Sequence, residues 1–123
     1  MKIVDVKAYP TSYRVPKERQ VSLGIGTMTK RDCVMVKVTS EDGIIGWGEC
    51  YGPARMTAAV VGSIAPWLIG EDPLRSDHLW QMIYARLRDH GQKGVVIQGL
   101  SGIDIALWDI KGKHFGEIGR AHV

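Results

Sequence analysis

Three carboxylates lie within or at the end of apolar segments, where an acidic side chain usually has a chemical or a structural role. Glu49 ends an apolar segment immediately before a loop, where it could face a cleft or accept hydrogen bonds from nearby backbone. Asp104 and Asp109 lie inside an otherwise apolar helical segment, and a buried carboxylate is costly unless it is paired. We therefore expect Asp104 and Asp109 each to meet a Lys, an Arg or a helix N-terminus. All three are interpreted as structural polar residues.

The other reactive residues form no recognisable site. The four histidines are spread over separate segments without the carboxylate neighbours of a metal site. Cys33 and Cys50 lack Cys-x-x-Cys spacing, which fits reduced structural thiols better than a disulfide or a zinc site. Gly24-x-Gly26 is not followed by the third glycine of a phosphate loop, because Thr29 stands there. The sequence thus predicts no catalytic residue and no metal ligand in this chain.

Composition is that of an ordinary globular domain. The 123 residues suffice to bury roughly two-thirds of the unfolded surface in one core, and 45% of them are hydrophobic against 24% charged. The net charge of +3 is scattered among acidic residues without a basic block, so nucleic-acid binding is not predicted. No segment is apolar for long enough to span a membrane or to resemble a signal peptide. We therefore expect a cytoplasmic protein.

Alternating residues predict an antiparallel meander in the first part of the chain. Asp42-Gly43 joins the second and third strands and is a strong hairpin signal, because glycine accepts the positive φ of the turn. Gly46-Trp47-Gly48 indicates either a bulge or a close backbone approach. Residues 15–30 show no sustained period and are predicted to form a long surface loop. The three strands are predicted over residues 2–14, 33–39 and 44–49.

Helices are predicted after the strands. A loop over residues 50–56 leads to a short helix that Thr57 caps and that Pro66 ends or kinks. Ser76 is expected to cap the next helix. The predicted fold class is therefore α+β, with a three-stranded antiparallel meander followed by a helical bundle. The buried stripe of the second helix comprises Leu79, Ile83 and Leu87.

The segment from Ser101 to Lys113 is too apolar for an exposed helix of a small domain. One stripe recurs at helical spacing, and most of the remaining circumference is apolar as well. Such a helix needs partners on two sides, one of them outside this chain. Without that partner, the stripe through Leu100, Ile103 and Leu107 should leave an exposed apolar patch. The full stripe is Val96, Leu100, Ile103, Leu107 and Ile110, and Ile105, Ala106 and Trp108 cover the other side.

Three motifs in this order resemble the N-terminal capping domain of the mandelate racemase/muconate lactonizing enzyme branch of the enolase superfamily. They run from Glu41 to Glu49, from Leu68 to Pro73 and from Ser101 to Lys113, and the resemblance covers residues 1–116. Residues 48–55 and 87–92 are similar to the galactarolactone cycloisomerase group of that family. The similarity ends after Gly116, and residues 117–123 are expected to be a non-native tail.

The resemblance implies a domain that covers the mouth of a C-terminal β/α barrel and closes with it over a small acid substrate. In such enzymes a Lys or His base removes the proton next to a carboxylate, and Mg²⁺ stabilises the resulting charge. The Mg²⁺ ligands, the base and the acid are expected in a barrel that this chain lacks. The chain alone is therefore expected to be inactive. The full-length enzyme is expected to be a homo-oligomer.

The resemblance also assigns substrate contacts to two loops, 15–30 and 51–56. The substrate-binding residues it suggests are Leu23, Thr27, Tyr51 and Arg55. The planar fork of Arg55 suits a carboxylate or a lactone oxygen, although a plain surface arginine has equal weight.

The expected reaction is proton abstraction next to the carboxylate of a sugar-derived acid or lactone, followed by cycloisomerisation. Dehydration of an acid sugar is the alternative within the family. A small binding module without catalysis is the alternative from another class.

Overall fold

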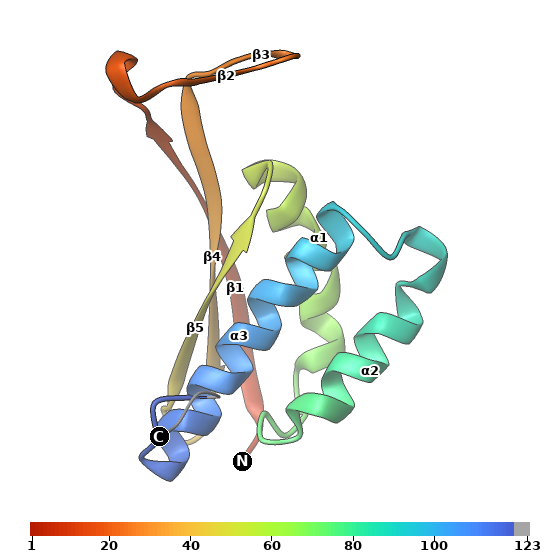
Figure 1. Ribbon diagram of the computed structural model, residues 1–123. Helices are drawn as coiled ribbons and strands as arrows, with labels where there is room; N and C mark the ends of the chain where they lie inside the picture. Colours follow the sequence, from red (N-terminus) through yellow and green to blue (C-terminus); the bar gives the residue numbers. More distant parts are fainter. Residues whose placement is uncertain (120–123) are drawn as a thin grey trace.

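The computed structural model describes residues 1–119, in which helices α1 and α3 pack on one face of a three-stranded antiparallel sheet and α2 packs against these two helices (Figure 1). The strand order is β1-β4-β5, so neighbouring strands of the sheet follow one another in a meander. This confirms the predicted α+β class. The elements are β1 (Ile3–Arg14), a 3₁₀ turn (Lys17–Arg19), β2 (Val21–Leu23), β3 (Gly26–Met28), β4 (Lys30–Ser40), β5 (Ile45–Tyr51), α1 (Ala54–Leu68), α2 (Ser76–Arg86), a second 3₁₀ turn (Arg88–His90) and α3 (Val95–Phe115).

The core forms where the alternating face of the sheet meets the helices. Val34, Val36 and Val38 are fully buried and point from β4 towards the helical layer, as their period of two predicts. The hairpin between β4 and β5 turns at Gly43, which adopts φ +84°. Each helix contributes fully buried side chains to the same cluster, including Ile64, Leu79, Ile83, Leu100 and Ile103.

Residues 15–30 are not a plain loop, contrary to the prediction. Strands β2 and β3 pair antiparallel as a small second sheet, and β4 already begins at Lys30. This hairpin stands apart from the helices, at the far end of the long β1–β4 ribbon (Figure 1). Its strands are only three residues long and exposed, so they leave no alternation of apolar and polar residues for a sequence pattern to detect.

Both predicted helix caps are wrong. Helix α1 begins at Ala54, with Pro53 at the N-cap, and Thr57 lies fully buried inside its first turn. Proline suits a helix start because its φ is preset and it has no N–H to satisfy. Helix α2 has Arg75 at its N-cap, and the buried Ser76 instead accepts a hydrogen bond from Lys111 Nζ at 2.8 Å. Pro66 lies within α1, which continues to Leu68.

Helix α3 lies directly on β5 because glycines remove the side chains between them. A Cβ on Gly46 would overlap the carbonyl oxygen of Ala106, and one on Gly48 would overlap that of Gly102. The register between β4 and β5 runs without interruption from Thr39↔Ile45 to Cys33↔Tyr51. Of the two interpretations of Gly46-Trp47-Gly48, the structure therefore selects the close backbone approach over the bulge.

The predicted exposed stripe on α3 is also wrong. Leu100, Ile103 and Leu107 are at most 1% exposed, because the sheet, α1 and α2 cover them. The side of α3 that remains open carries Ile105, which is 47% exposed, next to the 41% exposed Trp47 of β5. Helix α3 is thus apolar on two sides, as predicted. The side with Leu100, Ile103 and Leu107 is covered, and the side with Ile105 stays open.

Helix α3 ends in a hydrogen-bonded turn at Gly116, which has φ +70°. The Glu117 N–H bonds to the Gly112 carbonyl at 2.8 Å, and the Gly116 N–H bonds to that of Lys113 at 3.4 Å, a Schellman motif. Of the expected tail 117–123, residues 120–123 lie outside the described part of the chain. No helix within residues 1–119 is both long and apolar enough to cross a bilayer.

Candidate substrate-facing site

The four predicted substrate-binding residues lie towards the end of the sheet that joins the small hairpin. Tyr51 ends β5 opposite Cys33 and is 68% exposed, and Arg55 is exposed in the first turn of α1. Leu23 and Thr27 lie on the hairpin, where the Thr27 hydroxyl hydrogen-bonds that of Ser22 at 3.0 Å. The predicted loop 51–56 is mostly the last residue of β5 and the first turn of α1. Tyr51 and Arg55 are therefore held by regular structure.

Tyr51 and Arg55 border two neighbouring cavities. The first, of about 300 Å³, is lined by Tyr51, and the second, of about 520 Å³, is lined by Arg55. Three residues, Lys30, Asp32 and Pro53, line both cavities and so form a wall between them. Leu23 and Thr27 line neither cavity, so the structure brings together only two of the four predicted residues.

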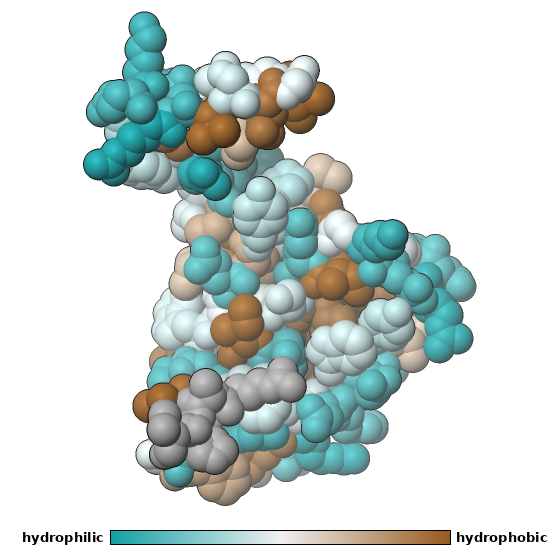
Figure 2. All heavy atoms as spheres, in the orientation of Figure 1, coloured by the Kyte–Doolittle hydropathy of each residue, from teal (hydrophilic) through white to brown (hydrophobic). Residues whose placement is uncertain are grey.

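The hairpin that carries Leu23 is a separate, apolar projection. Val21, Leu23 and Ile25 are 48%, 51% and 97% exposed. Figure 2 shows these apolar residues gathered on the projecting hairpin, away from the main body of the domain. Since nothing in residues 1–119 covers them, they are available to a substrate or to another protein surface.

The sequence analysis missed several residues that line these cavities, among them Ser12, Lys30, Arg31 and Asp32. They lie at the paired ends of β1 and β4, where Ser12 stands opposite Asp32. The Ser12 hydroxyl donates to Asp32 Oδ1 at 2.8 Å, and Lys30 Nζ lies 3.5 Å from Asp32 Oδ2. Assigning residues 15–30 to a loop hid the start of β4 and with it this pairing.

Among residues 1–119, two buried side-chain oxygens have no hydrogen-bond partner, and both lie near the start of α1 or α3. They are Gln98 Oε1, in the first turn of α3, and Thr57 Oγ1 in α1. Gln98 also lines the cavity at Tyr51 and packs so closely on Gly52 that a Cβ there would overlap its side-chain oxygen. Gly52 has φ +109°, a conformation that favours glycine. The turn between β5 and α1 thus contacts Gln98 and requires a glycine-type backbone conformation at Gly52.

The carboxylates singled out in the sequence have separate environments. Asp109 Oδ2 accepts a hydrogen bond from the Trp47 backbone N–H at 2.9 Å and lies 2.9 Å from Lys113 Nζ, so it ties α3 to β5. Asp104 is half-buried on the open side of α3. Glu49 is exposed on β5 opposite Met35. Glu49 and Asp109 therefore lie outside the walls of the two cavities at Tyr51 and Arg55.

Comparison with known proteins decides the family. The sequence pattern described as "Mandelate racemase / muconate lactonizing enzyme, N-terminal domain" matches residues 6–117. The chain belongs to the mandelate racemase/muconate lactonizing enzyme family. It corresponds to the N-terminal domain of these enolase-superfamily enzymes.

Curated relatives within this family act on sugar acids or their lactones. The chain is 55% identical over 87 residues to the D-galactarolactone cycloisomerase of Agrobacterium fabrum, covering 71% of this chain and 23% of that protein. It is 37% identical over 108 residues to the D-galactonate dehydratase of Verminephrobacter eiseniae, covering 86% of this chain and 24% of that protein. The chain therefore spans about a quarter of the length of these relatives.

Solved structures of the family share the fold. The 3,6-anhydro-D-galactonate cycloisomerase of Zobellia galactanivorans superimposes with a TM-score of 0.81 at 35% identity, covering 94% of this chain and 29% of that one. The L-talarate dehydratase of Polaromonas sp. JS666, complexed with Mg and L-glucarate, superimposes with a TM-score of 0.85 at 26% identity, covering 94% of this chain and 33% of that one. The family resemblance predicted from the three motifs is confirmed.

Mg²⁺ is implied by membership of this family, and one structural neighbour is complexed with it. The side chains of residues 1–119 do not fit that ion. Among residues 1–119, no three His, Cys, Asp or Glu side chains come together as a ligand set. The one carboxylate on the wall between the cavities, Asp32, is already engaged by Ser12 and Lys30.

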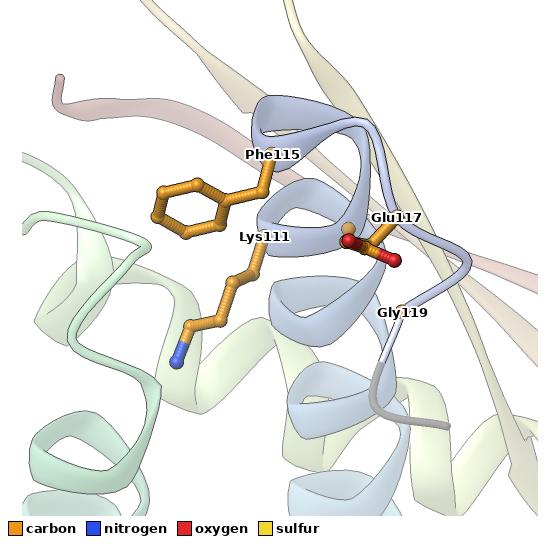
Figure 3. Close-up of a pocket in the computed structure, with 5 residues that line it drawn as sticks. Lys111, Phe115, Glu117 and Gly119 are labelled. Atoms are coloured by element: carbon orange, nitrogen blue, oxygen red, sulfur yellow. The ribbon is translucent and has the colours of Figure 1, made fainter. Parts of the chain in front are cut away.

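A further cavity, of about 320 Å³, lies beside the C-terminal turn of α3 (Figure 3). Lys111 and Phe115 project from the helix there, and Glu117 lies beyond the turn. The ammonium of Lys111 donates to Ser76 Oγ at 2.8 Å and sits 4.2 Å from the centre of the Trp108 ring. Lys111 therefore ties α2 to α3. Its ammonium is engaged in these structural contacts at the cavity.

The buried thiol of Cys50 predicts a pH dependence of stability. Burial raises its pKa from 9.0 to about 11, so above pH 9.0 the unfolded chain loses a proton that the folded domain keeps. The free energy of unfolding should therefore fall as the pH rises from 9.0 towards 11. Urea unfolding of the wild type and of Cys50→Ala over this range measures the effect, with Cys33→Ala as the matched control. A wild-type minus Cys50→Ala difference that stays constant with pH would contradict the assignment.

Proposed function

We propose that this chain is the capping and specificity domain of a Mg²⁺-dependent enzyme that abstracts the proton next to the carboxylate of a sugar-derived acid or lactone. The substrate class proposed first is a galactarolactone-like compound, converted by cycloisomerisation. Support comes from the 55% identity to a D-galactarolactone cycloisomerase. Dehydration of an acid sugar is the second candidate, favoured by the 37% identity to a D-galactonate dehydratase over a longer stretch.

Charge at the substrate-facing end supports an anionic substrate. Arg55, Lys30 and Arg31 line the two cavities there, and the only carboxylate among their walls is the engaged Asp32. Arginine presents a planar pair of donors that matches a carboxylate. Tyr51 would contact the substrate from the end of β5, and Leu23 and Thr27 would approach it on the projecting hairpin only when the enzyme closes.

The partner proposed for the open side of α3 is the β/α barrel of the same enzyme. A cavity of about 500 Å³ on this side is lined by Trp47, Ile105 and Trp108 together with Asp104 and Asp109. An apolar surface of this kind is typical of an interface that another surface covers. The Mg²⁺ ligands and the proton-transferring groups are assigned to that barrel, and the domain alone is proposed to be inactive. A cytoplasmic location and a homo-oligomeric enzyme remain part of the proposal.

Two chimeric enzymes test the substrate. In each, residues 1–117 of this chain replace the matching N-terminal segment, in one case of the Agrobacterium fabrum cycloisomerase and in the other of the Verminephrobacter eiseniae dehydratase. We expect the first chimera to keep the larger fraction of its parent's kcat/KM, measured with D-galactarolactone and D-galactonate respectively.

The alternatives give different results in the same assay. A larger retained fraction in the dehydratase chimera would move the assignment to acid-sugar dehydration. If both chimeras fold cooperatively, assemble like their parents and still show no turnover, the capping role is wrong and the non-catalytic binding module is favoured.

A further inference from the structure

Asp32 stands where three elements meet. Its carboxylate accepts the Ser12 hydroxyl of β1 at 2.8 Å and lies 3.5 Å from Lys30 Nζ at the start of β4. The Asp32 side chain is 21% exposed, whereas that of Lys30 is 63% exposed. Asp32 also lines a cavity together with Pro53, Ala54 and Arg55, the first residues of α1. One carboxylate thus joins the ends of β1 and β4 and shares a cavity wall with the beginning of a helix.

Helix α1 has no capping group of its own. Pro53 at its N-cap makes no side-chain hydrogen bond, and its first turn contains no acidic residue. The free N–H groups and the dipole at a helix start favour a nearby negative charge. The Ala54 backbone N–H, after the Ser12 hydroxyl and Lys30, is among the groups that hold the pKa of Asp32 below its usual 3.8. The carboxylate from β4 therefore lies beside the helix terminus that the helix sequence leaves uncapped.

We propose that Asp32 is a positioning residue, which through Ser12, Lys30 and the start of α1 fixes the segment from Tyr51 to Arg55 at the substrate-facing edge. The effect on substrate binding rests on the proposed function. The effect on the start of α1 does not depend on it. The charged group paired with Asp32 is Lys30, and Arg31 and Arg55 line the same cavities. Neutralising Asp32 would remove the counter-charge of Lys30 and the negative charge beside the start of α1.

The first test uses the whole 123-residue chain and amide hydrogen exchange. The Thr57 N–H closes the first turn of α1 by bonding to the Pro53 carbonyl at 3.0 Å. In Asp32→Asn we expect this amide to exchange about threefold faster or more, while the Ile64 amide in the same helix is unchanged. Asp32→Glu should restore part of the protection because it keeps the charge.

The matched control is Asp5→Asn. Asp5 forms a comparable ion pair on β1, with Lys7 at 3.7 Å, near the opposite end of that strand. If Asp32 and Lys30 form only a solvated ion pair, Asp32→Asn should behave like Asp5→Asn. Equal exchange rates of the Thr57 amide in the two variants would therefore overturn the proposal. Should Asp32→Asn fail to fold, Ser12→Ala removes one donor and keeps the charge. It should give a smaller acceleration of the same amide, and an unchanged rate there would also overturn the proposal.

The second test uses the active chimera. We expect Asp32→Asn to raise KM about tenfold while kcat stays within about twofold, because lost positioning of binding groups weakens substrate and transition state alike. Asp5→Asn should change neither. If Thr57 exchange accelerates but KM does not move, Asp32 caps α1 without positioning the substrate-facing segment, and the inference is wrong. If both chimeras are inactive, the proposed function fails while the exchange experiment still decides the structural part.

Discussion

Replacing Gly48 by alanine is expected to lower the free energy of unfolding by about 3 kcal/mol. The added Cβ would overlap the Gly102 carbonyl oxygen and would lie 2.9 Å from the Ala106 backbone nitrogen. Both are backbone atoms in the middle of α3, so neither can move without shifting the helix off the sheet. Thermal unfolding followed by circular dichroism should show a midpoint about 10 °C lower.

The control for this change is the same substitution at Gly62, in α1. A Cβ there meets nothing within 4 Å, and the residue is exposed in a helix interior. Gly62→Ala should therefore raise stability by about 0.5–1 kcal/mol, because alanine loses less backbone freedom on folding. If Gly48→Ala and Gly62→Ala changed stability in the same direction, the close approach of α3 to β5 would not be a feature of the folded domain.

The second large effect is expected at Leu107, where truncation to alanine should cost about 3 kcal/mol. Leu107 is 1% exposed between the sheet and the other helices, and deleting its methyl groups leaves a cavity in the middle of the core. The measurement is the midpoint of urea unfolding at an unchanged slope.

Ile105 supplies the matched control two residues earlier on the same helix. It is 47% exposed, and Ile105→Ala should change stability by no more than about 0.5 kcal/mol. A large loss of stability in Ile105→Ala with a small loss in Leu107→Ala would contradict this structure. It would mean that α3 is rotated so that the stripe through Leu107 is exposed.

The sequence by itself determined the order of the three main strands and the three helices, and the family. The alternation of Val34, Val36 and Val38 identified a strand with one buried face, and Asp42-Gly43 located the hairpin turn. Leu79, Ile83 and Leu87 are buried as their spacing predicted. These signals are local, because each follows from the period of one element or from the conformation that one residue allows.

Only the tertiary structure decided which side of α3 is buried and how the proposed substrate-facing end is assembled. A helix that is apolar around most of its circumference has no preferred face in its own sequence, so contact with Gly46 and Gly48 of β5 sets its rotation. Asp32 likewise acquires its role from Ser12 and from the start of α1, which are distant along the chain. Chain folding brings such groups together through long-range contacts, which residue spacing does not encode.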